Sequence, residues 1–217
     1  LLASCALKQN DMNAYAAALE KIVTFTPKPE YWLDLIVRTG NKAGFSPALT
    51  LDTYRLRKAT GTMEKTGDYM EAAQLALQAG YPAEAKGFVD EGYSKKLLGE
   101  GADAPRHQRL KDLVAKKLAE DQATLAEGEK AAAAQATGDA LVATGFNLVT
   151  YGQNDKGLQL IQQGIAKGGL KAPEQAKLHL GVAQVLAGKK SEANKTFAGV
   201  GGTDGSKDLA RLWTLVR

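Results

Sequence analysis

The chain has 217 residues, of which 36 are alanine, 23 are glycine, 14 are aromatic and one is cysteine. This length suits one large domain or two small ones. The lone Cys5 excludes an internal disulfide framework, and two histidines leave little for a metal site. No apolar run approaches the roughly 18–20 residues that span a bilayer, so we expect no transmembrane segment.

Small side chains favour closely packed helices, and strand-forming residues never occur in alternating runs. We therefore expect an all-α fold. In the N-terminal part, a turn at 9–11 precedes a helix over 14–25. Residues 31–39 and 47–59 then form a second helix pair, joined by a glycine-containing turn at 40–44.

An internal repeat follows. Three stretches superimpose, namely residues 69–85, 141–157 and 177–193. Each has a small residue, a glycine seven positions later and another small residue five positions beyond it. In chain order these triplets are Ala73, Gly80 and Ala85; Gly145, Gly152 and Gly157; and Gly181, Gly188 and Ala193. The repeat thus predicts two helices per unit.

The spacing has a physical cause. The central glycine takes the left-handed conformation that ends the first helix, and the small residues let the second helix approach closely. Val89, Ile161 and Phe197 then line the inner faces of the second helices. One pair cannot bury its apolar face alone, so neighbouring pairs must stack.

The segment 101–137 departs from the repeat. It predicts either two degenerate helices or one long helix over 105–136 with a kink at Gly128, preceded by a hinge at 99–104. We therefore divide the chain into N-terminal helix pairs (1–98), this helical segment (99–137) and C-terminal pairs (138–217).

A basic stripe lies in this segment, with Asp112 as its one acid; its members are Arg106, Arg109, Lys111, Lys116 and Lys117. The stripe has two interpretations. It binds a nucleic acid or another anionic surface, or it is simply the solvated face of a helix. No aromatic residue for base stacking occurs between Tyr93 and Phe146. We therefore do not expect nucleic acid to be the main partner.

A last helix is predicted at the C-terminus. Apolar residues recur at helical spacing at Leu209, Leu212, Trp213 and Val216, after Ser206 as a candidate N-cap. This helix would cover the open apolar face of the last repeat, which is the capping role that solenoids require.

The repeated small residues, turn glycine and later alanine resemble the tetratricopeptide repeat (TPR) family, whose unit has about 34 residues. The resemblance implies a right-handed α-α superhelix of about five to six helix pairs. The chain is also similar to exported proteobacterial TPR proteins without an assigned activity, on Leu1–Asn13, Asp68–Lys86, Asn147–Leu170 and 203–213. That similarity implies a periplasmic or secreted C-terminal part of a longer protein, with a cytoplasmic adaptor as the alternative.

TPR proteins bind partners in a concave groove lined by their first helices, so the resemblance implies a groove here. Its candidate residues are Leu33, Val37, Met70, Gln74, Leu77, Val142, Phe146, Leu178 and Val182. The family's carboxylate clamp uses Lys and Asn at such positions, and this chain departs from that pattern. A mostly apolar groove suits an amphipathic helix or an extended apolar peptide. The alternative is that these residues are ordinary core between repeats.

No motif indicates catalysis. The glycine-rich stretch 199–207 lacks the spacing of a phosphate loop and follows a helix. His107 and His179 have no ligand partners at metal spacing, and the carboxylates Glu71 and Glu84 have no nucleophile beside them. We expect no enzyme, cofactor or metal, but a scaffold for a protein or peptide partner. Self-association through an apolar edge near the N-terminus, at Leu1 and Leu2, is the remaining alternative.

Overall fold

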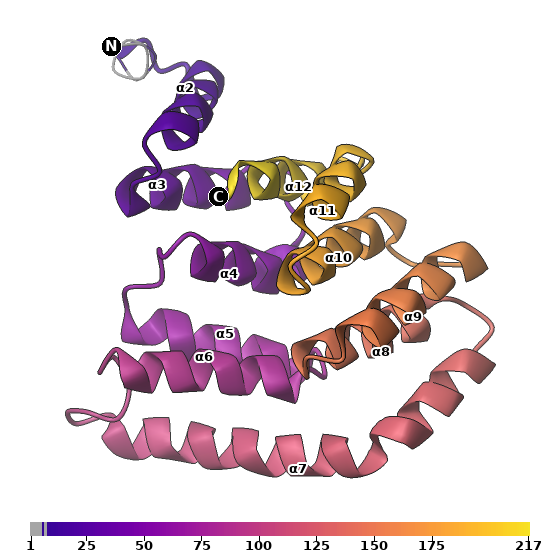
Figure 1. Cartoon of the computed structure of the whole chain (residues 1–217). Helices are drawn as coiled ribbons and strands as arrows, with labels where there is room; N and C mark the ends of the chain where they lie inside the picture. The colour runs from indigo at the N-terminus through magenta and orange to yellow at the C-terminus, as the bar shows by residue number, and fades with distance from the viewer. Residues whose placement is uncertain (1–5, 7) are drawn as a thin grey trace.

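The described part of the chain is built from helices and the loops that join them. The computed structural model describes residue 6 and residues 8–217, and none of these residues belongs to a strand, which confirms the all-α expectation. The elements are α2 (Met12–Phe25), α3 (Pro29–Gly40), the 3-10 turn η1 (Pro47–Leu49), α4 (Thr50–Ala59), α5 (Thr66–Gln78), α6 (Pro82–Ser94), α7 (Ala104–Ala134), α8 (Asp139–Thr150), α9 (Asn154–Lys167), α10 (Pro173–Leu186), α11 (Lys190–Ala198) and α12 (Ser206–Leu215) (Figure 1). The apolar edge proposed at Leu1 and Leu2 lies outside the described residues.

The three repeated stretches form three helix pairs, α5 with α6, α8 with α9 and α10 with α11. Their turn glycines Gly80, Gly152 and Gly188 have φ angles of +80°, +79° and +75°. This confirms the left-handed helix ends that the sequence predicts, at positions where a side chain would be strained.

Helices α8 and α9 approach each other very closely. A Cβ atom added at Gly145 would lie 2.6 Å from the Gly157 carbonyl oxygen and 2.8 Å from the Ile161 backbone nitrogen. The two helices therefore touch backbone to backbone. In α10 the equivalent Gly181 instead makes room for an aromatic ring, because a Cβ there would lie 2.3 Å from Phe197.

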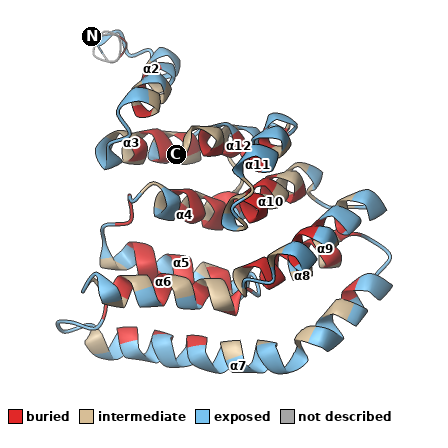
Figure 2. Ribbon diagram, in the orientation of Figure 1, coloured by how far each residue is buried: buried red, intermediate tan, exposed pale blue. Residues whose placement is uncertain are grey.

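The segment between the repeats is one long helix, α7, of 31 residues. Only His107, Leu110, Val114 and Ala132 of this helix are buried. Figure 2 shows α7 as a mostly exposed helix, and it contacts α5, α6 and α8. It therefore links the N-terminal pairs to the C-terminal pairs. The five residues of the basic stripe are all exposed on it.

The two ends of the fold meet. Helix α12 packs against α10 and α11 and also contacts α2 and α4 (Figure 1). The Ser46 amide donates a hydrogen bond to the Asp204 carbonyl oxygen at 2.8 Å. Two ion pairs join the same regions, Lys42 with Asp208 at 3.0 Å and Arg211 with Glu20 at 2.8 Å. The chain therefore curves until its last helix reaches its first described ones.

The start of α12 differs from the sequence prediction. Gly205 is its N-cap, with a φ of +102°, and Ser206 is the first helical residue. The Asp204 carboxylate accepts hydrogen bonds from the Ser206 amide at 3.0 Å and from its hydroxyl at 3.1 Å. Glycine is required at 205 because a Cβ there would lie 2.4 Å from the Phe45 ring. Among the described residues no helix combines the length and apolar character that crossing a bilayer demands.

Candidate functional site

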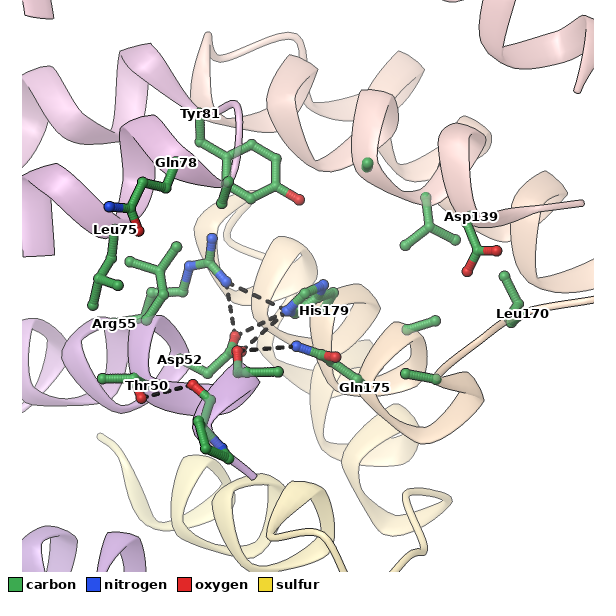
Figure 3. A pocket seen from close by; sticks show the side chains of 18 residues that line it. Thr50, Asp52, Arg55, Leu75, Gln78, Tyr81, Asp139, Leu170, Gln175 and His179 are labelled. Atoms are coloured by element: carbon green, nitrogen blue, oxygen red, sulfur yellow. Dashed lines mark hydrogen bonds and ion pairs between the residues drawn. The ribbon is translucent and has the colours of Figure 1, made fainter. Parts of the chain in front are cut away.

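A cavity of about 430 Å³ opens between helices from both halves of the chain (Figure 3). Its walls come from η1, α4, α5, α8 and α10 and from the loops before α6 and α10. Apolar walls are formed by Leu51, Leu75, Val142, Leu170 and several alanines. The polar lining residues are Thr50, Asp52, Arg55, Gln78, Tyr81, Asp139, Gln175 and His179.

A buried ion cluster centred on Arg55 forms part of this lining. The Arg55 Nε and Nη2 donate to the Glu84 carboxylate, each at 2.7 Å, and Nη1 donates to Asp52 at 2.8 Å. The Arg55 side chain is 4% exposed and that of Asp52 is 1% exposed. The guanidinium also lies 4.3 Å from the centre of the Phe146 ring. Arg55 is therefore held from three sides.

His179 completes the cluster from α10. Its Nε2 lies 3.1 Å and 3.2 Å from the two carboxylate oxygens of Asp52. Arg55 Nη1 lies 3.4 Å from the same Nε2. The two shorter contacts are to ionised Asp52, which can only accept hydrogen bonds, so we assign the proton to Nε2; this leaves Nδ1 with a lone pair whenever the ring is neutral. Burial raises the pKa of the Asp52 carboxyl, but His179 and Arg55 outweigh this and hold its pKa below the ordinary range.

Local sequence explains how the cluster residues are presented. Asp52 and Arg55 are three positions apart on α4, so they share one helix face. Gly80 ends α5, and Tyr81 then immediately precedes Pro82, the first residue of α6. This sharp return brings the Tyr81 ring to 5.3 Å from the Arg55 guanidinium.

A second cavity of about 600 Å³ borders Arg55 and Glu84 from another direction. Its apolar lining includes Phe88, Val149 and Trp213. Trp213 is 3% exposed, and its Nε1 has no hydrogen-bond partner among the described residues. Arg55 therefore belongs to the wall between two cavities.

The sequence-predicted groove residues do not share one cavity. Val142 lines the first cavity, Val182 lines the second, and Phe146 packs on Arg55 and Tyr81. Met70 and Gln74 instead line a separate hollow beside α7. The other predicted groove residues differ in burial: Leu178 is buried, Leu33 and Leu77 are half-buried, and Val37 is 46% exposed.

Sequence reasoning missed Asp52, Arg55 and Tyr81. The available signal was the pair of opposite charges three residues apart on α4, flanked by Leu51 and Leu56. Such a pair normally lies on a solvated helix face, and its burial depends on partners distant in the sequence. Among the described residues, no group of three or more His, Cys, Asp or Glu side chains could hold a metal ion.

The buried Tyr81 predicts a dependence of stability on alkaline pH. Burial raises the pKa of its hydroxyl from 10.0 to about 12, although Arg55 acts in the opposite direction. The pKa of the folded state exceeds that of the unfolded state. The resulting stabilisation is therefore fully present below pH 10 and is lost as pH rises through about 12, by about 3 kcal/mol in total.

Urea unfolding at pH 9 and pH 11 measures the first part of this loss. We expect Tyr81→Phe to lose less stability between the two values than the wild-type chain does. Tyr31→Phe is the control, because it removes the hydroxyl of a half-buried tyrosine that does not line the cavity. Equal losses in wild type and Tyr81→Phe would contradict the prediction.

Comparisons of the chain with protein-family models, with curated proteins and with solved structures find no significant match. The residues that line the cavity come from four stretches of the chain, 47–55, 75–81, 139–143 and 170–179, so the site exists only in the folded chain.

Proposed function

We propose that this chain is a non-enzymatic, TPR-like helical-repeat scaffold that binds a segment of a protein partner in the 430 Å³ cavity. The cavity itself is the observation that carries the proposal. Its mainly apolar walls surround a few fixed polar groups, which is the usual composition of a recognition site. The repeated helix pairs support a right-handed superhelix as the scaffold.

The chemistry of the lining favours binding over catalysis. Its described residues include no serine or cysteine, and the Thr50 hydroxyl donates to the Pro47 carbonyl oxygen at 2.7 Å. The three nitrogens of Arg55 that could stabilise a developing anion already bond to carboxylates. A nucleophile and a free oxyanion donor are the groups that acyl or phosphoryl transfer requires.

The size of the cavity limits what can enter. A volume of about 430 Å³ accommodates one or two side chains, whereas a whole helix needs a cylinder roughly 10 Å wide. A partner segment would therefore insert individual side chains. The exposed Gln78 and half-buried Gln175 lie in the lining and can hydrogen-bond the partner's backbone.

A displayed library of random peptides tests this function. Ala143 lines the cavity and is exposed, so Ala143→Trp fills the space without disturbing a buried contact. Ala126, on the exposed part of α7, provides the matched control Ala126→Trp. We expect peptides selected on the wild-type chain to bind Ala126→Trp equally and Ala143→Trp at least about tenfold more weakly, because filled space excludes the side chain.

Circular dichroism and unfolding midpoints would first establish that both tryptophan variants are folded. Failure to select any peptide that distinguishes the two variants would refute the proposed function. Selected peptides that bind both variants equally would place recognition elsewhere on the molecule.

A further inference from the structure

The cavity has an excess of negative charge. Three carboxylates, Asp52, Glu84 and Asp139, lie in its wall or directly behind it, against the single guanidinium of Arg55. The balance stays negative even if His179 is protonated. No lysine occurs among the described residues that line the cavity. Positive charge is therefore favoured inside it.

Two polar groups of the lining are unpartnered. Tyr81 is 6% exposed, and its hydroxyl points toward the cavity without a hydrogen bond to any described residue (Figure 3). His179 bonds Asp52 through Nε2, so the lone pair of neutral Nδ1 remains without a partner in the described part of the chain. Both atoms can accept a hydrogen bond.

Asp139, on the other wall of the cavity, can also accept further hydrogen bonds. Asp139 lies across the cavity from the Asp52–Arg55 pair (Figure 3). One of its carboxylate oxygens accepts from the Lys171 amide and the other from the Thr137 hydroxyl, each at 3.1 Å. Each carboxylate oxygen has two lone pairs, so each can accept one more donor.

We infer that the cavity is a recognition pocket for a basic side chain, lysine or arginine, of the partner segment. This inference rests on the proposed function and specifies the chemistry of the partner. An ammonium or guanidinium supplies only donors, which match the acceptors of Asp139, Tyr81 and His179. The aliphatic stem of such a side chain would lie against the apolar walls.

An acidic side chain does not fit the same lining. Among the described lining residues, Arg55 carries the one guanidinium, and it already uses Nε, Nη1 and Nη2 on Asp52 and Glu84. A carboxylate entering the cavity would meet Asp139 without a free cation to offset the repulsion.

Nuclear magnetic resonance of the two histidines tests the inference directly. His179 lines the cavity, while His107 is buried in α7 and accepts a hydrogen bond from the Gly99 amide, so it is an internal reference. N-acetyl-lysine methylamide and its arginine analogue should shift the imidazole signals of His179 but not those of His107. The norleucine analogue has the same stem without the charge and should produce little shift.

A pair of protein variants tests the role of charge. Asp139→Asn removes a cavity carboxylate from the first turn of α8, and Asp155→Asn removes the equivalent carboxylate from the first turn of α9, outside the cavity. We expect Asp139→Asn to weaken binding of the lysine probe about tenfold, since a hydrogen bond to a charged group is lost. Asp155→Asn should leave the binding unchanged.

Equal His179 shifts with the lysine and norleucine probes, or no shift with either, would overturn the inference. A free diamine such as putrescine that binds more tightly than the lysine probe would overturn it as well, in favour of a soluble polyamine ligand. The proposed function fails separately, when no library peptide distinguishes Ala143→Trp from Ala126→Trp. If such peptides are selected but the lysine probe does not bind, only the basic side chain is refuted.

Discussion

Replacing Arg55 by methionine should reduce the free energy of unfolding by about 3–5 kcal/mol, because the substitution leaves Asp52 and Glu84 buried without their counter-charge. Asp52 is 1% exposed and the Glu84 side chain is 12% exposed, so water offsets the loss of the guanidinium only weakly. Urea unfolding followed by circular dichroism measures the change. The aromatic contact with Phe146 at 4.3 Å is lost in the same variant and acts in the same direction.

Arg38→Met is the matched control. Arg38 pairs with Asp34 at 2.6 Å, but both side chains are about a third exposed. We expect a loss below about 1 kcal/mol there. The triple variant Arg55→Met, Asp52→Leu, Glu84→Met should recover much of the stability lost in Arg55→Met, since it removes the uncompensated charges. Equal effects of Arg55→Met and Arg38→Met would show that the cluster is not effectively buried.

The second large loss of stability is expected from a substitution at the contact between α8 and α9. Gly145→Ala would place a Cβ 2.6 Å from the Gly157 carbonyl oxygen and 2.8 Å from the Ile161 backbone nitrogen. Backbone atoms cannot move aside as a flexible side chain can, so the helices must separate. We expect a loss of about 2–3 kcal/mol, the upper part of the range for overpacked cores.

The same substitution at Gly128 should have the opposite effect on stability. Gly128 is exposed within α7, and a Cβ added there meets no atom within 4 Å. Alanine is the better helix former, so Gly128→Ala should raise stability by about 0.5–1 kcal/mol. Thermal or urea unfolding of the two variants side by side measures the contrast. Destabilisation by Gly128→Ala, or an unaffected Gly145→Ala, would contradict the packing described for these helices.

Local sequence predicts some features of this fold and not others. The repeat locates the three turn glycines and the small residues of each pair, because steric demands act between neighbouring positions. It also predicts the inner-face residues Val89 and Ile161, which are 1% and 0% exposed. The repeat, with seven residues from the first small residue to the glycine and five more to the second small residue, is enough to place them.

The cavity could not be predicted in the same way. Arg55 bonds Glu84, 29 positions away in the sequence, and Asp52 contacts His179, 127 positions away. Neither separation follows from a helical period. The groove residues that the family resemblance implies contribute to three different hollows, with Val142 in the first cavity, Val182 in the second and Met70 and Gln74 beside α7.

The sequence by itself determined the helical class, the helix pairs and their turn glycines. Periodicity and backbone conformation are properties of adjacent residues, so these features need no knowledge of distant segments. The tertiary structure alone decided that the segment between the repeats is one helix, that the two ends meet and that Arg55 is buried between carboxylates. Burial of a charge depends on which distant groups surround it, and only the folded chain brings Asp52, Glu84 and His179 together.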